Sequence, residues 1–316
     1  MVMNFWEAQR RARSRTLWYV FVFILLTIGV ACLAEWSMRF FAPESYDPPF
    51  PFIGLGFLAI TFTVAIFQYL TFSLQGGAYV AESMGGIQLT PQNANSAKEQ
   101  QLLNIVEEIA LASSIPTPPV YLIQAQEINA FAAGLTPENA VIAVTEGSVN
   151  NLTRDELQGV IAHEFGHIYN GDMLIGMRMA AMVMGFYFVL YLAMNIMRFS
   201  SIRGRRSDNK GGNPIMIAAI ILCAAGALTW LAGSILKCMI NRQREYLADA
   251  SSVQFTRNPN GIIGALRKIE NEQTHDMPKK GIAYSHLYFE DTSLVNQLFA
   301  THPPIAKRIA ALEGQK

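Results

Sequence analysis

Two histidines and a glutamate are spaced so that they could bind a metal ion and activate water. Residues 163–167 read HEFGH, which places His163 and His167 one turn apart on one face of a helix. Zinc suits two imidazole nitrogens and a carboxylate, with a fourth position left for water, whose pKa falls to about 7. Glu164 is placed to act as general base for that water. The pattern predicts one Zn²⁺ per subunit and hydrolytic chemistry; the alternative is two surface histidines on an ordinary helix.

A third protein ligand has to come from another element. The best candidate is Glu245 in the stretch NRQREYLADA, and Asp249 follows one turn later on the same helix face. We expect Glu245 to bind the metal and Asp249 to accept the N–H of a ligand imidazole. The alternative for this pair is a solvated helix face, matched by Arg242 and Arg244.

The helix that carries HEFGH has clear boundary signals. Thr153 and Glu156 form a T-x-x-E capping box, and Gly171 is a stop signal. We therefore expect this helix to extend from residue 154 to about residue 170.

Upstream of this helix, the sequence predicts another helix and a small sheet. Apolar residues recur at helical spacing over 98–112. Three segments that follow, 120–123, 128–133 and 140–145, are short, rich in β-formers and bounded by turn residues. Segment 128–133 is either an ordinary sheet strand or an open edge to which an extended substrate adds as an extra strand.

The composition indicates that part of the chain lies in lipid. Of 316 residues, 51% are hydrophobic and only 15% are charged, with a net charge of +0. Soluble domains usually carry about 25% charged residues, and the balance argues against a disordered protein or a nucleic-acid binder. Four apolar segments are long enough to cross a bilayer as helices: 17–34, 50–74, 177–199 and 214–240. The last two could instead form a buried helical hairpin in a soluble core.

These spans divide the chain into four parts. Residues 1–74 contain two membrane helices, and residues 75–176 contain the sheet and the HEFGH helix. Residues 177–240 form a membrane hairpin, and residues 241–316 supply the third ligand and further helices, the last of which starts at Pro304. An even number of crossings puts both soluble parts on one side, where they can form one site. The expected fold class is α+β: mainly helical, with a small sheet and about four transmembrane helices.

Basic residues indicate the orientation. Four arginines precede the first span: Arg10, Arg11, Arg13 and Arg15. By the positive-inside rule they place the N-terminus and the active site in the cytoplasm. The loop between the last two spans is also basic, with Arg203, Arg205, Arg206 and Lys210 against Asp208. That loop would lie outside if both spans cross, so the alternative is that they enter the membrane without crossing it.

Four stretches carry a family resemblance: INAFAAG (128–134), TRDELQGVIAHEFGHIYNGD (153–172), REYLADASSVQFTRNPNGIIGALRKI (244–269) and HPPIAKRIAAL (302–312). With them the sequence resembles the CaaX prenyl protease/HtpX-type family of integral-membrane zinc metallopeptidases, and most closely its HtpX-type bacterial heat-shock peptidases. HExxH followed by ExxxD, with a membrane hairpin between them, is a highly specific combination, and the resemblance spans most of the chain.

The resemblance implies a gluzincin fold in which His163, His167 and Glu245 bind zinc and Glu164 is the catalytic base. It also implies a bacterial inner-membrane enzyme of the stress response, which removes damaged or misassembled membrane proteins.

Two further regions are expected near the cleft. The resemblance implies that the strand with Asn129, Ala130 and Phe131 borders it. Similar family members carry a histidine and an arginine where this chain has His302 and Arg308, and either group could stabilise an oxyanion. His302 could instead reach the zinc as a fourth, inhibitory ligand. The alternative is a histidine at a helix start and a solvated arginine.

The sequence thus predicts a multi-pass membrane zinc metalloendopeptidase that acts on unfolded or membrane proteins and binds no nucleic acid. A catalytically silent scaffold or binding protein with the same fold is the alternative function, and the intact HEFGH argues against it. A channel or transporter is disfavoured because the spans contain few charges, namely Glu35, Arg178 and Arg198 near their ends. A protease of broad specificity is also expected to cut its own loops during purification.

Overall fold

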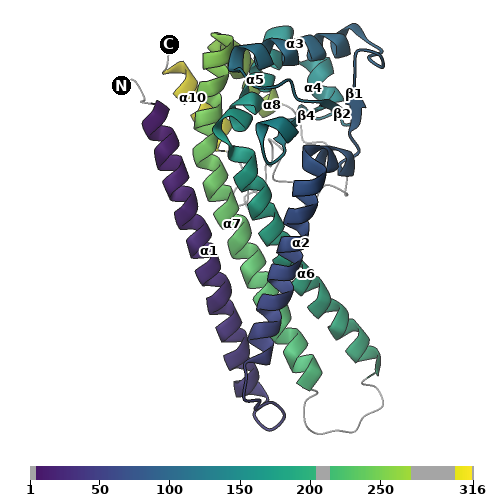
Figure 1. Ribbon diagram of the computed structural model, residues 1–316, viewed down its shortest axis with the longest axis vertical. Coiled ribbons are helices and arrows are strands. Elements are labelled where there is room, and N and C mark those ends of the chain that lie inside the picture. The colour runs from purple at the N-terminus through teal and green to yellow at the C-terminus, as the bar shows by residue number, and fades with distance from the viewer. Residues whose placement is uncertain (1–4, 204–213, 272–302, 315–316) are drawn as a thin grey trace. The chain divides into compact units, whose positions relative to one another are not determined.

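The computed structural model describes residues 5–203, 214–271 and 303–314 of the 316-residue chain. They form mainly helices with one small sheet, which confirms the expected α+β class (Figure 1). The chain divides into two compact units. The first contains the described residues of 1–15, 70–178 and 237–316, and the second contains 16–69 and 179–236.

The sheet of the first unit has four strands in the order β1-β2-β4-β3. β1 (Ile87–Leu89) runs antiparallel to β2 (Val120–Ile123), and β2 runs parallel to β4 (Val141–Thr145). β3 (Ala130–Ala133) pairs antiparallel with β4 and therefore lies at an edge of the described sheet. The three predicted strands are confirmed. β1 was not predicted because three residues are too few to show a period-two pattern.

Helices pack on this sheet and enclose the core of the first unit. α5 (Arg154–Asn170) packs against α3 (Ala97–Ser113), α8 (Pro259–Asn271) and strand β3. α10 (Ile305–Glu313) packs against α8. The short helices η1 (Pro137–Asn139) and α4 (Glu146–Asn151) were not predicted. The core consists of apolar side chains from all these layers, among them Leu102, Ile142, Ile161, Leu266 and Leu312.

The α5 helix has the predicted boundaries. The Thr153 side chain accepts a hydrogen bond from the Glu156 amide, and the Glu156 carboxylate accepts one from the Thr153 amide. Gly171 ends the helix in the left-handed region, with φ of 70°. Near its middle, a Cβ on Gly159 would collide with the backbone of Ile262 in α8. Glycine here allows the two helix backbones to touch.

Four helices of the described residues contain a segment long and apolar enough to cross a membrane. The helices are α1 (Phe5–Phe41), α2 (Phe52–Ser83), α6 (Asp172–Arg203) and α7 (Pro214–Thr256). The candidate spans are Phe21–Phe41, Phe52–Ser83, Asp172–Phe199 and Pro214–Leu236. The helices extend beyond the predicted spans because polar residues at their ends remain helical, whereas hydropathy marks only the apolar part.

In the first unit, α2 bends at Gly76, whose backbone has φ of 63° and ψ of −158°. A Cβ on the next residue, Gly77, would collide with the carbonyl group of Ala133 at the end of β3. The bend therefore lets the end of α2 pass directly over the edge strand. The predicted boundary between the parts 1–74 and 75–176 lies next to this bend.

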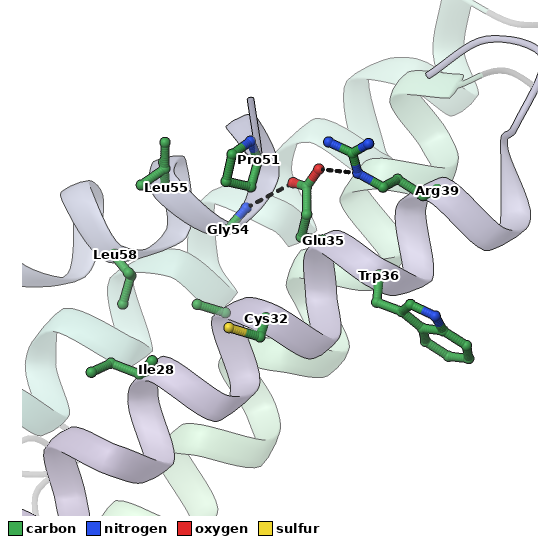
Figure 2. A pocket seen from close by; sticks show the side chains of 10 residues that line it. Ile28, Cys32, Glu35, Trp36, Arg39, Pro51, Gly54, Leu55 and Leu58 are labelled. Atoms are coloured by element: carbon green, nitrogen blue, oxygen red, sulfur yellow. Dashed lines mark hydrogen bonds and ion pairs between the residues drawn. The ribbon is translucent and has the colours of Figure 1, made fainter. Parts of the chain in front are cut away.

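In the second unit, Glu35 of α1 caps the start of α2. Its Oε2 accepts hydrogen bonds from the amides of Ile53 at 3.0 Å and Gly54 at 3.3 Å, and from the Tyr46 hydroxyl at 3.0 Å. Its Oε1 lies 2.9 Å from Nε of Arg39. Figure 2 shows Glu35 directed toward Gly54 and Arg39 in the wall of a mostly apolar cavity of about 330 Å³. These contacts satisfy amides that the first turn of a helix leaves without partners.

Candidate metal centre

His163, His167 and Glu245 meet in the first unit, two from α5 and one from α7. Their ligand atoms all lie within 4.8 Å of one another. Nε2 of His163 is 3.4 Å from Oε2 of Glu245, and Nε2 of His167 is 3.5 Å from Oε1. Zinc bonds of about 2.1 Å in a tetrahedral site put neighbouring ligand atoms about 3.4 Å apart. The two histidine–glutamate distances therefore match the spacing of ligand atoms around a divalent metal ion.

The glycine inside HEFGH allows α7 to approach. A Cβ on Gly166 would lie 3.0 Å from Cα of Ala248 and 3.1 Å from Cβ of Ser251. Nδ2 of Asn170 also donates to the Gly166 carbonyl at 2.8 Å and to the Ser251 hydroxyl at 3.2 Å. Close contact between α5 and α7 brings Glu245 within reach of both histidines.

Asp249 and Arg308 support the first histidine. Oδ1 of Asp249 lies 3.0 Å from Nδ1 of His163. Arg308 donates from Nε and Nη2 to the two Asp249 oxygens at 2.9 and 2.6 Å, and its Nη1 lies 3.2 Å from Oε2 of Glu245. Burial alone would raise the pKa of Asp249, but the charge and hydrogen bonds of Arg308 outweigh it and lower this pKa to about 2. An ionised Asp249 accepts the Nδ1–H, which leaves Nε2 of His163 available to a metal.

The second histidine has a similar pair of partners. Nδ1 of His167 lies 3.1 Å from Oδ2 of Asp172, and Oδ1 of Asp172 lies 2.7 Å from Nη1 of Arg244. Sequence reasoning missed Asp172, although it stands five residues after His167 and directly after the glycine that ends the helix.

The alternative of a solvated face around Glu245 is wrong, because Glu245 is 2% exposed and Arg244 is 5% exposed.

The charges of this centre favour a divalent cation. Among the residues that the structure describes, four carboxylates face two guanidinium groups, an excess of two negative charges when the imidazoles are neutral: Glu164, Asp172, Glu245 and Asp249 against Arg244 and Arg308. Burial alone would lower the pKa of His163 and His167, but hydrogen bonds to the carboxylates outweigh it and raise both. A field that favours a proton on imidazole also attracts a metal cation. A buried excess charge is costly, and a dication would neutralise it.

Glu164 joins the centre to the edge strand. Its Oε2 accepts a hydrogen bond from the amide of Ala132 in β3 at 2.8 Å. Its charge also raises the pKa of His167, after the larger effects of burial, Asp172 and Glu245. The predicted general base therefore lies beside both the ligand cluster and β3.

The predicted substrate strand is placed next to Glu164, but its side chains are covered. Asn129, Ala130 and Phe131 are 2–4% exposed. The backbone amide of Asn129 donates to the hydroxyl groups of Thr145 and Ser148, at 3.0 and 2.7 Å. Its side-chain Oδ1 is buried and makes no hydrogen bond within the part of the chain that the structure describes.

The two remaining predicted residues have different outcomes. His302 lies outside the described residues. Arg308 is 0% exposed, so the alternative of a solvated arginine is wrong. Its guanidinium is directed at Asp249 and Glu245, and its suggested role at an oxyanion stays a prediction.

The fold and this centre together define a membrane metallopeptidase of the HExxH class. The sequence model of peptidase family M48 matches residues 96–316, more than half of the chain, and the protein belongs to this family. This confirms the family resemblance read from the sequence.

Relatives and one solved structure agree with this assignment. "Protease HtpX homolog" of Ligilactobacillus salivarius (strain UCC118) is 38% identical over 279 residues, which cover 82% of this chain and 93% of the relative. "Protease HtpX homolog" of Caldanaerobacter subterraneus subsp. tengcongensis is 33% identical over 310 residues, covering 98% and 97%. The crystal structure of S. mikatae Ste24p matches with a TM-score of 0.50 and 19% identity, over 99% of this chain and 67% of that one, and supports the fold alone. The protein is a multi-pass membrane metallopeptidase, placed in a lipid bilayer and acting on protein substrates.

Proposed function

We propose that this protein is a zinc endopeptidase of the bacterial plasma membrane that degrades damaged or misfolded membrane proteins from the cytoplasmic side. The observation that carries the proposal is the convergence of His163, His167 and Glu245 beside Glu164, in a buried cluster whose described residues carry an excess of negative charge that a divalent cation would balance. Two imidazoles and one carboxylate, with room for a fourth ligand, are typical of catalytic zinc.

The chain's own residues supply the proton transfers. A bound zinc ion would lower the pKa of a water molecule and polarise the peptide carbonyl. Glu164 accepts the proton of the attacking water and later donates it to the leaving amine. The Ala132 amide, 2.8 Å from Oε2, holds the Glu164 carboxylate toward the edge strand, where the peptide bond would lie.

The geometry of β3 supports substrate binding by strand addition. Residues of an antiparallel strand alternate between facing the partner strand and facing away. The Asn129 carbonyl accepts from the Thr145 amide at 3.0 Å, so the backbone groups of Ala130 and Ala132 point away from β4. An extended peptide could pair with the amide and carbonyl of Ala130 and with the carbonyl of Ala132, and lie across Glu164, to which the Ala132 amide donates. Ala130 is 2% exposed, so pairing can begin only after this edge is uncovered.

Recognition through the backbone fits a quality-control enzyme. Strand addition reads main-chain amides, which every sequence offers, so it selects unfolded segments rather than particular side chains. The four candidate spans bring the enzyme into the same bilayer as such substrates.

The test of the catalytic claim compares the wild type with Glu164→Gln, both purified in detergent and loaded with zinc. Unfolded casein is the substrate. We expect the variant to keep about one zinc per chain while its cleavage rate falls about 10²–10⁴-fold. Equal cleavage by both proteins would refute the mechanism, and bound zinc with no cleavage by the wild type would favour a silent scaffold. If the wild type binds no zinc after loading, the proposed metal site is wrong.

A separate labelling experiment tests the cytoplasmic orientation. A single cysteine at Leu111, which is 83% exposed in the first unit, would be introduced after removing Cys32, Cys223 and Cys238. We expect a membrane-impermeant maleimide to label it only after spheroplasts are permeabilised. Labelling of intact spheroplasts would place the peptidase on the outer side.

A further inference from the structure

Each candidate ligand histidine contacts its own aspartate, and each aspartate contacts its own buried arginine. On His163 the partners are Asp249 and Arg308. On His167, Asp172 lies 3.1 Å from Nδ1 and Arg244 lies 2.7 Å from Asp172. The side chains of Asp172 and Arg244 are 9% and 6% exposed, so this is an ion pair withdrawn from water. A buried ion pair stabilises a fold little by itself, which leaves its effect on His167 as its main consequence.

A single glycine directs Asp172 back toward the centre. α5 ends at Asn170, Gly171 has φ of 70°, and α6 begins at Asp172. This left-handed residue ends α5, and the Asp172 carboxylate that follows it contacts His167 in the last turn of that helix. Side chains other than glycine strain this conformation.

Arg244 and the ligand Glu245 are consecutive residues of α7. One side chain extends to Asp172 and the next to the two histidines. The same turn of α7 therefore supplies a metal ligand and the group that fixes the carboxylate on His167.

We propose that Asp172 and Arg244 are positioning residues for the metal ligand His167. The inference rests on the proposed metal site. Asp172 accepts the Nδ1–H of His167, which fixes the ring and leaves the Nε2 lone pair toward the metal. Arg244 holds the Asp172 carboxylate in that position. Asp172 is also the first residue of α6, and Arg244 lies in α7, so this ion pair connects these two helices next to the metal ligand within the first unit.

The test measures zinc binding by the full chain in detergent. Zinc alone is titrated against a competing chelator for the wild type, Asp172→Asn and Arg244→Gln. Loss of an outer partner of a ligand histidine typically weakens metal affinity 10–100-fold. We expect a loss in this range for Asp172→Asn, a loss in the same direction for Arg244→Gln, and partial recovery with Arg244→Lys. The matched control is Arg154→Gln, which removes an exposed ion pair with Glu108 and should leave zinc affinity unchanged.

Two further measurements separate positioning from folding. The double variant Asp172→Asn/Arg244→Gln removes both charges, so neither stays buried alone, and its melting temperature with EDTA reports the metal-free fold. Cobalt(II) in place of zinc gives an absorption spectrum that depends on ligand geometry. We expect the double variant to melt close to the wild type with EDTA, to bind zinc 10–100-fold more weakly, and to show a changed cobalt spectrum.

The possible failures are distinguishable. If the wild type binds zinc and the variants match it in affinity and cobalt spectrum, the positioning role is wrong and the proposed function stands. If zinc affinity falls only in proportion to the lost folded fraction, the pair is structural and the proposal is also wrong. If the wild type binds no zinc, the proposed function fails together with the inference.

Discussion

Replacing Arg308 with glutamine should destabilise the metal-free protein far more than a surface substitution. The guanidinium is 0% exposed and contacts Asp249 at 2.6 and 2.9 Å and Glu245 at 3.2 Å. The shorter, neutral side chain would remove the guanidinium that two buried carboxylates, Asp249 and Glu245, contact. Removing one partner of a buried ion pair costs about 3–5 kcal/mol.

This cost corresponds to a large change in melting temperature. For a domain of this size, about 1 kcal/mol lowers the melting temperature by about 2–4 °C, so Arg308→Gln should lower it by about 6–20 °C. The assay is thermal unfolding in detergent with EDTA, because bound metal would add its own stabilisation. The control is Arg154→Gln, whose side chain is 48% exposed and whose pair with Glu108 contributes at most about 1 kcal/mol.

Two results would refute the reasoning. One is a melting temperature for Arg308→Gln that equals that of Arg154→Gln. The other comes from adding Asp249→Asn to Arg308→Gln. Because this second change removes an uncompensated buried charge, it should restore part of the lost stability, and a further loss of similar size would contradict the ion-pair account.

Three other substitutions test other parts of the structure. Gly166→Ala should lower the free energy of unfolding by about 1–3 kcal/mol and weaken zinc binding, because the added Cβ would press on the α7 backbone. The control Gly176→Ala, whose added Cβ would have no atom within 4 Å, should change neither quantity. Equal effects of the two substitutions on melting temperature and zinc affinity would contradict this prediction. Burial alone would raise the pKa of Glu156, but hydrogen bonds with Lys268 and Thr153 lower this pKa below its ordinary value of 4.5. The ionised Glu156 carboxylate therefore stabilises the fold above pH 4.5, and this stabilisation is lost as the pH falls further and the carboxylate is protonated. The difference in melting temperature between wild type and Glu156→Gln, measured with EDTA, should therefore shrink as the pH falls below 4.5, and a constant difference would argue otherwise. Glu35→Ala should lower stability by about 1–3 kcal/mol because it leaves the first amides of α2 without an acceptor; unchanged unfolding in detergent would exclude this cap.

Signals that act over a few residues predicted the central part of the site. Thr153, Glu156 and Gly171 set the ends of α5 through hydrogen bonds and a backbone conformation of their own, so the helix has the predicted bounds. His163 and His167 lie on the same face of α5 because residues four apart are neighbours on the surface of a helix.

Contacts between distant segments were harder to predict. Asp172 belongs to the next helix, and its return to His167 depends on the conformation of one glycine. Arg308 is buried because α10 packs against α8, and no local pattern distinguishes this arginine from one in water. Hydropathy found the apolar segments but not every helix end, since α2 extends to Ser83, nine residues beyond the predicted span 50–74.

Arg308 follows every other described residue of the metal centre in the chain. The ribosome therefore synthesises α5, α6 and α7, which carries Glu245, before Arg308. Until α10 docks, Asp249 and Glu245 do not have the contacts with the Arg308 guanidinium. The buried contacts around Asp249 and Glu245 can therefore be completed only after both α6 and α7 have been synthesised.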